Sequence, residues 1–189
     1  MSTTDARWQS RVDDLWARFD DYTPEAFVAE LERVTAEGAA DVPRAVVEFE
    51  RAGGFDSVGR TPEAVPLYRA ALAAGSGAGS DGGEPGLDAW RRRQATVQLA
   101  SSLRALGQAE EAVALLEAEA AHPIAGDDEN AREAEKLQDA VLAFLALALA
   151  DAGREREAVG VALGALAPHV PRYRRSLTNY AAALRGPAD

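Results

Sequence analysis

One pattern of small, bulky and turn residues occurs three times in this chain and constrains the fold more than any other feature. The copies align on Gly59, Gly107 and Gly153, and each glycine follows a bulky apolar residue by four positions and precedes a Glu-Ala-Val segment. One alanine stands seven positions before each glycine and another five positions after it; these are Ala52 and Ala64, Ala100 and Ala112, and Ala146 and Ala158. Self-similarity of this kind predicts an array of structural repeats.

The residue types at these positions predict that each copy is a pair of antiparallel helices. A glycine can take the left-handed conformation that ends one helix and lets the chain reverse. The two alanines let the helix axes approach closely, and the bulky residue fills the seam between them. Composition agrees, because 42 alanines and a single isoleucine favour helix over sheet. We therefore expect an all-α fold.

Hydrophobic periodicity, helix caps and glycine positions together divide the chain into segments. About nine helices are expected, at residues 5–19, 24–38, 42–55, 61–74, 87–106, 109–121, 129–152, 155–167 and 171–185. The sequence predicts a single domain over 1–189, with an N-terminal helix pair (1–40), repeat units (42–74, 87–121 and 129–167) and a C-terminal capping helix (171–185). Residues 75–86, which read GSGAGSDGGEPG, are expected to form a flexible loop because they carry little apolar surface to bury.

The three copies resemble the tetratricopeptide repeat. The segments that carry the resemblance are GRTPEAVPLYRAAL from Gly59, LASSLRALGQAEEAVALL from Leu99 and LALALADAGREREAV from Leu145. The arrangement is similar to compact tetratricopeptide proteins of high-GC bacteria, although the turn glycines lie 48 and 46 residues apart, against about 34 in an ordinary repeat. The TPEA sequence at residues 23–26 recurs at 61–64, which favours a degenerate repeat in the N-terminal pair.

The resemblance implies a right-handed superhelical array whose first helices line a concave groove for a peptide or helix of a partner protein. The residues that it places in this groove are Val46, Phe49, Asp56, Gln94, Val97, Ser101, Arg104 and Leu147. Asp56 and Arg104 would fix the polar ends of the bound segment. The alternative interpretation is that the chain's own terminal helix covers this face.

The most apolar stretch, residues 140–150, is apolar around nearly its whole circumference. Such a helix is usually buried on all sides, and we expect it to lie in the core. Self-association through an exposed face is the alternative. The stretch has 11 residues, whereas a membrane span needs about 20, so no membrane insertion is expected.

Charge and composition argue against several classes of function. A net charge of −11 disfavours binding to nucleic acid, whose phosphates are neutralised by Lys and Arg. The acidity is uneven: residues 1–90 carry 8 basic and 17 acidic residues, and residues 91–189 carry 12 and 14. This asymmetry could steer an acidic partner, or another copy of the chain, to the C-terminal end. The alternative, which is more common, is that the basic residues there simply face solvent.

The sequence carries no recognisable catalytic constellation. Cysteine is absent, and neither His122 nor His169 has a second ligand at a spacing typical of metal sites. No enzyme activity, metal or cofactor is expected. The opening MSTTDARWQS lacks the apolar stretch of a secretory signal, which predicts a cytoplasmic location.

The leading functional hypothesis is a non-catalytic adaptor, monomeric or weakly dimeric, that binds a protein or peptide partner. The alternatives are a regulator that senses a ligand or peptide, and a structural homo-oligomer.

Overall fold

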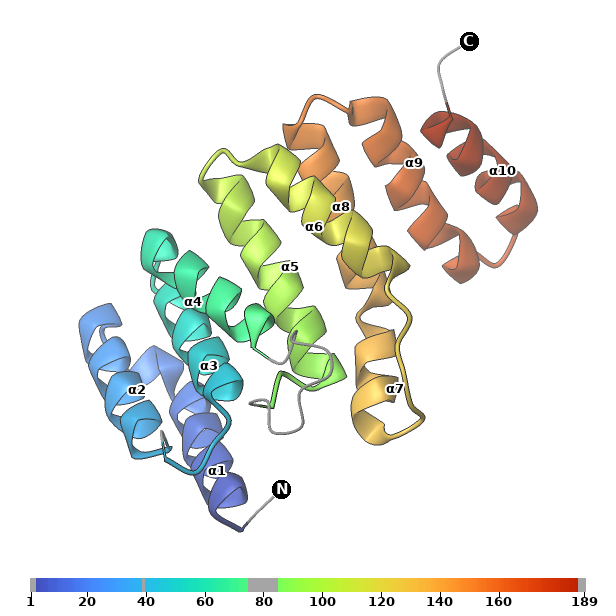
Figure 1. Ribbon diagram of the computed structural model, residues 1–189. Coiled ribbons are helices and arrows are strands. Elements are labelled where there is room, and N and C mark those ends of the chain that lie inside the picture. The colour runs from blue at the N-terminus through green and yellow to red at the C-terminus, as the bar shows by residue number, and fades with distance from the viewer. Residues whose placement is uncertain (1–2, 39, 75–84, 187–189) are drawn as a thin grey trace. The chain divides into compact units, whose positions relative to one another are not determined.

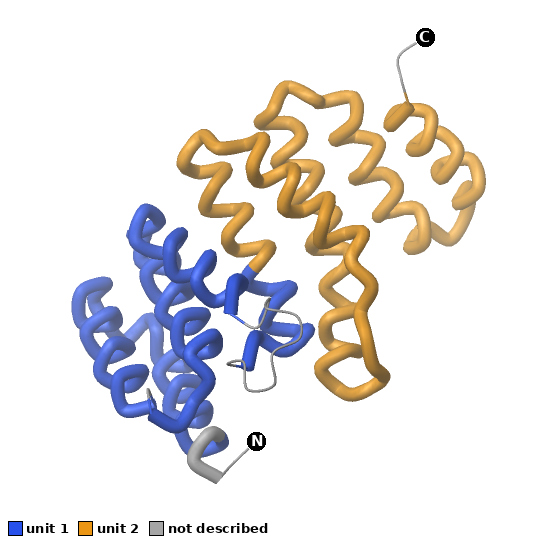
Figure 2. The backbone as a smooth tube through the Cα atoms, viewed as in Figure 1, with its two compact units in different colours: residues 1–95 blue, residues 96–189 orange. Residues whose placement is uncertain are grey.

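The computed structural model describes residues 3–38, 40–74 and 85–186, and within these ranges all regular structure is helical. The chain divides into two compact units, Met1–Ala95 and Thr96–Asp189 (Figure 2). The single-domain organisation over 1–189 therefore stays a prediction. Most of the expected loop at 75–86 lies outside the described residues. No described helix is long and apolar enough to cross a membrane.

The first unit consists of successive helices that double back on one another (Figure 1). Its elements are α1 (Thr3–Ala17), the 3-10 turn η1 (Phe19–Asp21), α2 (Pro24–Gly38), α3 (Arg44–Ser57), α4 (Thr61–Ala73) and the beginning of α5 (Ala89–Ala105). Helix α2 packs on both α1 and α3, and α3 packs most extensively on α4. The N-terminal segment expected as a helix pair is therefore a packed pair, α1 and α2.

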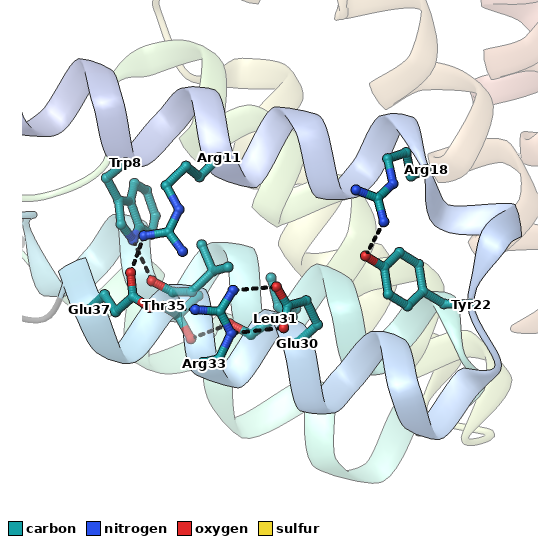
Figure 3. Close-up of polar contacts among 10 residues, drawn as sticks. Trp8, Arg11, Arg18, Tyr22, Glu30, Leu31, Arg33, Thr35 and Glu37 are labelled. Carbon is teal, nitrogen blue, oxygen red and sulfur yellow. Dashed lines mark hydrogen bonds and ion pairs between the residues drawn. The ribbon is translucent and has the colours of Figure 1, made fainter.

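The α1–α2 pair is held by an apolar seam with polar contacts along its edge (Figure 3). Trp8 is 5% exposed, and its indole Nε1 donates a hydrogen bond of 3.0 Å to the Val34 carbonyl, which satisfies the one polar atom of the ring. At the surface, Arg11 of α1 pairs with Glu37 of α2. Both charges are exposed, so burial of the apolar seam rather than this ion pair supplies most of the stability.

Helix α3 approaches α2 closely through a glycine. A Cβ atom added to Gly54 would lie 2.0 Å from Cδ2 of Leu31, a side chain that is itself 1% exposed. Any larger residue at position 54 would have to displace the buried Leu31 side chain or shift the two helices. Gly54 is therefore required here by packing, since its backbone is ordinary helix.

The second unit contains the remaining helical pairs. Its elements are the rest of α5, α6 (Ala109–Ala121), α7 (Glu129–Lys136), α8 (Gln138–Asp151), α9 (Glu155–Leu166), the 3-10 turn η2 (Ala167–His169) and α10 (Arg174–Arg185). Within this unit α8 packs on α6 and on α9, and α9 also packs on α10. The described residues thus confirm the all-α class.

Several helix boundaries differ from expectation. The helix expected at 129–152 is broken at Leu137, whose N–H bonds to the Ala134 carbonyl at 3.1 Å in a tight turn, and the two parts are α7 and α8. Among the described residues, the expected number of about nine helices holds if α7 and α8 are taken as one element. Helix α5 begins at Ala89 because the Asp88 carboxylate accepts from the Arg91 N–H at 2.8 Å. The last helix begins at Arg174 rather than at residue 171.

The three turn glycines share one helix-ending geometry. Gly59, Gly107 and Gly153 have φ of 79°, 75° and 75°, in the left-handed region. The residue after each glycine donates its N–H to the carbonyl of the bulky residue of the pattern; these pairs are Arg60 with Phe55, Gln108 with Leu103 and Arg154 with Leu149, each at 2.8 Å. This is the Schellman arrangement, which satisfies carbonyls that the helix end would otherwise leave free. The bulky residue therefore packs through its side chain and also accepts, through its carbonyl, the hydrogen bond that closes the helix end.

Candidate partner-binding surfaces

Helix α8 is not buried on all sides, which corrects the expectation for residues 140–150. One face is in the core, with Val141 and Leu149 fully buried. The opposite face is open: Leu147 is 48% exposed, and Ala143 and Ala150 are exposed as well. The apolar circumference of this helix therefore presents hydrophobic surface to the outside of the second unit.

This open face forms one wall of an apolar groove, and α9 forms the other. The groove has a volume of about 460 Å³. Its lining is entirely apolar and mostly alanine: Ala143, Ala146 and Leu147 from α8, and Ala158, Val159, Ala162 and Ala165 from α9. Small side chains leave room in the groove for the larger side chains of an incoming helix, as happens where packed helices approach closely.

Comparison of α9 with α6, the equivalent helix of the preceding repeat, shows that the groove lacks a covering helix. Val113 of α6 and Val159 of α9 occupy the same column of the repeat, six residues after their turn glycines. Val113 is 2% exposed, because α8 packs on α6. Val159 is 49% exposed. The surface that α6 offers to the next helix is covered, and the matching surface of α9 is open.

The last helix does not fill this position, because it packs on a different face of α9. A Cβ added to Gly160 would lie 2.9 Å from the Ala181 carbonyl of α10, and one added to Gly164 would lie 4.0 Å from the Ala181 Cβ. Positions 160 and 164 are one turn apart on α9 and point roughly opposite to the groove-lining positions 158 and 162. Helix α10 thus caps α9 but leaves the α8–α9 groove uncovered.

The residues predicted to line a concave groove differ in how exposed they are. Val46 and Gln94 of the first unit, and Val97 and Ser101 of the second, are partly exposed. Phe49 is only 7% exposed, so its side chain lies in the core and is not available to line the predicted groove. Leu147 is well exposed and lines the α8–α9 groove.

The two charged residues expected to fix a bound segment already have partners inside the chain. The Arg104 guanidinium lies 2.7 Å from the Asp151 carboxylate, and Asp56 accepts a hydrogen bond of 3.4 Å from the Thr61 hydroxyl. Each contact lies within one unit and joins the end of a helix to a neighbouring turn or helix. Their positions are therefore explained by the fold itself.

A buried polar cluster in the first unit was not expected from the sequence. Glu50 is 8% exposed, and its carboxylate accepts a hydrogen bond of 3.2 Å from Trp16 Nε1. Burial raises the pKa of Glu50, and the Trp16 hydrogen bond and the nearby Arg91 only partly offset this effect. Burial also raises the pKa of Tyr68, whose side chain is fully buried. Helical periodicity alone could not have singled out Glu50, because an acid on an amphipathic helix is usually solvated.

Both residues of this cluster are buried side chains of the first unit. Glu50 and Tyr68 are enclosed by protein and have little surface to offer a substrate. Among the described residues, no group of three or more His, Asp or Glu side chains is placed to hold a metal ion. His169 instead lies 2.9 Å from the Asp139 carboxylate at the protein surface.

Comparisons with known proteins agree with the helical-pair geometry. A family model described as "Tetratrico peptide repeat" matches residues 45–184. Among solved structures, the chain is similar to a crystal structure of nearly identical TPR-like repeats of a kinesin light chain from Podosopora anserina. The TM-score is 0.59 at 18% identity, and the match covers 98% of this chain and 97% of the other. No curated protein sequence matches. The family match covers most of the chain, which therefore belongs to the tetratricopeptide repeat family.

Proposed function

We propose that this chain is a non-catalytic protein-interaction module that binds a helix or an extended segment of another polypeptide. The family supports this function in general terms, since stacked helical pairs present extended surfaces for partners. The observation that carries the proposal is the open α8–α9 groove, where Val159 is 49% exposed although its counterpart Val113 is covered by a helix. An uncovered apolar surface rimmed by polar residues is typical of interaction sites.

The proposed contact surface is centred on Leu147, Val159 and Leu166, which are 48%, 49% and 50% exposed. Large apolar side chains at a groove of small residues provide the buried contacts that dominate binding energies. Val46 and Gln94 of the first unit and Val97 and Ser101 of the second, all partly exposed, stay separate predicted contact residues in this proposal. No step of the proposal requires catalysis.

Site-specific photocrosslinking tests this function directly. A photoreactive amino acid at position 159 of the full chain, illuminated in an extract of its native cells, should give discrete crosslinks to polypeptide. The same group at exposed Glu110, on α6, is the matched control and should give none of these products. Identical product patterns at positions 159 and 110 would refute a specific binding surface at the α8–α9 groove.

A further inference from the structure

An aromatic pocket lies in the first unit, at the turn that joins α1 to α2. It is formed by η1, the start of α2 and the end of α3. Its volume is about 340 Å³. This is near the lower end of the about 300–1,000 Å³ that small-molecule sites occupy, so the pocket has room for one long side chain of a ligand.

Three aromatic rings line this pocket. Phe27 is 1% exposed and forms its base, while Phe19 and Tyr22 are partly exposed. The Phe27 ring meets Phe19 edge to face with the ring centres 4.7 Å apart, and it meets Tyr22 in the same manner at 6.2 Å. These contacts hold the rings in place, so the pocket is formed before a ligand arrives. The face of an aromatic ring carries partial negative charge and attracts cations.

The polar groups at the pocket also favour a cation. The exposed Asp20 carboxylate lines it and makes no ion pair with any residue that the structure describes. Ser57 ends α3, whose last turn has no basic residue to offset the negative end of the helix dipole. The positive end of α2 also borders the pocket. It is offset by Glu25 in the first turn and by the Thr23 hydroxyl, which accepts a hydrogen bond of 3.3 Å from the Ala26 N–H.

Two arginines close to the pocket in sequence already lie against aromatic rings of the first unit. The Arg18 guanidinium is 5.4 Å from the centre of the Tyr22 ring and donates a hydrogen bond of 2.7 Å to its hydroxyl (Figure 3). The Arg60 guanidinium is 4.5 Å from the centre of the Phe55 ring. Each of these arginines is also paired with a carboxylate, and neither lines the pocket. The pocket offers the same two groups, an aromatic ring and a carboxylate, to a cation from outside the chain.

We propose that this aromatic pocket binds the arginine side chain of a basic segment of another polypeptide. A guanidinium is planar, so it can stack on an aromatic ring and donate hydrogen bonds to a carboxylate at the same time, whereas the lysine ammonium is compact and strongly hydrated. The charge around the pocket favours the encounter, because residues 1–90 carry 17 acidic and 8 basic residues. This site lies in the first unit and adds to the α8–α9 groove of the second unit, without depending on it.

NMR of the isotope-labelled full chain tests the site by titration with the peptide acetyl-Gly-Arg-Gly-amide. The backbone amide signals of Asp20, Tyr22 and Ser57 should shift, with a dissociation constant in the millimolar range because a single side chain is bound. The same peptide with citrulline in place of arginine has nearly the same shape and no charge. It should bind at least about fivefold more weakly. Raising the salt concentration from about 20 to about 300 mM should weaken binding of the arginine peptide only.

Two substitutions separate the carboxylate from the ring. Asp20→Asn should weaken binding of the arginine peptide about two- to fivefold and leave binding of the citrulline peptide unchanged. Asp14→Asn, at an exposed position of α1 outside the pocket, changes the net charge equally and should bind like the wild type. Phe19→Leu keeps an apolar side chain but removes the ring, and it should also weaken binding of the arginine peptide. Far-UV circular dichroism should show that each variant keeps its helix content.

Three results would overturn the proposal: equal affinity for the arginine and citrulline peptides, amide signals of the pocket that stay unchanged up to about 20 mM arginine peptide, or equal affinities of Asp20→Asn and Asp14→Asn. Tighter binding of phosphocholine than of the arginine peptide would also overturn it, since the pocket would then favour a quaternary ammonium group. The photocrosslinking experiment at position 159 is independent of these results. Failure of the aromatic pocket and failure of the α8–α9 groove are therefore distinguishable.

Discussion

The contrast between Val113 and Val159 predicts that the same substitution in the same repeat column has two different effects on stability. Truncation of Val113 to alanine removes two methyl groups from a side chain that is 2% exposed. At about 0.8 kcal/mol for each buried methyl, the transfer contribution is about 1.6 kcal/mol, and the cavity that remains raises the loss to about 2–3 kcal/mol. Alanine's higher helix propensity returns about 0.5 kcal/mol. A net loss of about 2 kcal/mol is expected.

Val159→Ala should be almost neutral. Its side chain is 49% exposed, so the transfer contribution is about half, about 0.8 kcal/mol, and no closed cavity forms. The same propensity gain of about 0.5 kcal/mol nearly cancels this loss. Both positions lie in the second unit and in the second helix of a pair, so each variant serves as the control for the other.

Urea unfolding followed by far-UV circular dichroism measures the difference, at a protein concentration of a few micromolar so that association is negligible. With a slope of about 1–3 kcal/mol per molar urea, Val113→Ala should lower the midpoint by roughly 1 M and Val159→Ala by less than about 0.3 M. Equal losses for the two variants would mean that α9 is covered as α6 is. That result would refute an open groove in the monomer.

Three further variants test the packing and the buried carboxylate. Gly54→Ala should destabilise by about 1–3 kcal/mol, measured by urea unfolding, because its Cβ would lie 2.0 Å from Leu31. Gly107→Ala should cost about 1 kcal/mol in the same assay, since φ is 75° although space is free. Burial raises the pKa of Glu50, so the folded state retains a proton that the unfolded state releases near pH 4.5. Stability should therefore fall as pH rises from about 4.5 through the folded-state pKa, and Glu50→Gln should remove this component.

Each of these variants has a control or a contradicting result. Gly164→Ala, where the nearest atom is 4.0 Å away, should be neutral or slightly stabilising, and a loss as large as that of Gly54→Ala would refute the packing explanation. A neutral Gly107→Ala would show that the left-handed turn is not required. For Glu50, stability is compared with that of Glu50→Gln at pH 5, 6, 7 and 8. A wild type whose stability relative to this variant rises over that range would contradict a raised pKa.

The local rules of helix formation made much of the fold predictable from the sequence. Gly59, with its positive φ, marks the end of α3. The start of α2 is marked by Thr23, whose hydroxyl accepts a hydrogen bond of 3.3 Å from the Ala26 N–H, and by Pro24 directly after it. Such signals depend on neighbours within one turn and can be recognised in a single sequence. The break at Leu137 has no glycine or proline to mark it, so periodicity predicted one continuous helix.

The candidate site was less predictable, for a physical reason. Apolar composition shows that a helix can be buried, but whether it is buried depends on which helix packs against it. Leu147 and Leu149 are equivalent by hydropathy, yet one is 48% exposed and the other fully buried. The open groove exists because α10 packs through Gly160 rather than over Val159. Which face of α9 contacts α10 is determined by the tertiary structure and cannot be read from the hydropathy of α9 alone.

Thiol labelling measures the accessibility of the groove most directly, because the chain has no cysteine and each introduced thiol is unique. The variants are Val159→Cys and Val113→Cys, treated with a thiol reagent under native conditions at low protein concentration. An open groove predicts that the thiol at position 159 reacts within about tenfold of the rate in the unfolded chain, while the one at position 113 reacts at least about 100-fold more slowly, because it requires local unfolding. Equal protection at the two positions would show that α9 is covered, and would contradict the docking surface proposed for this chain.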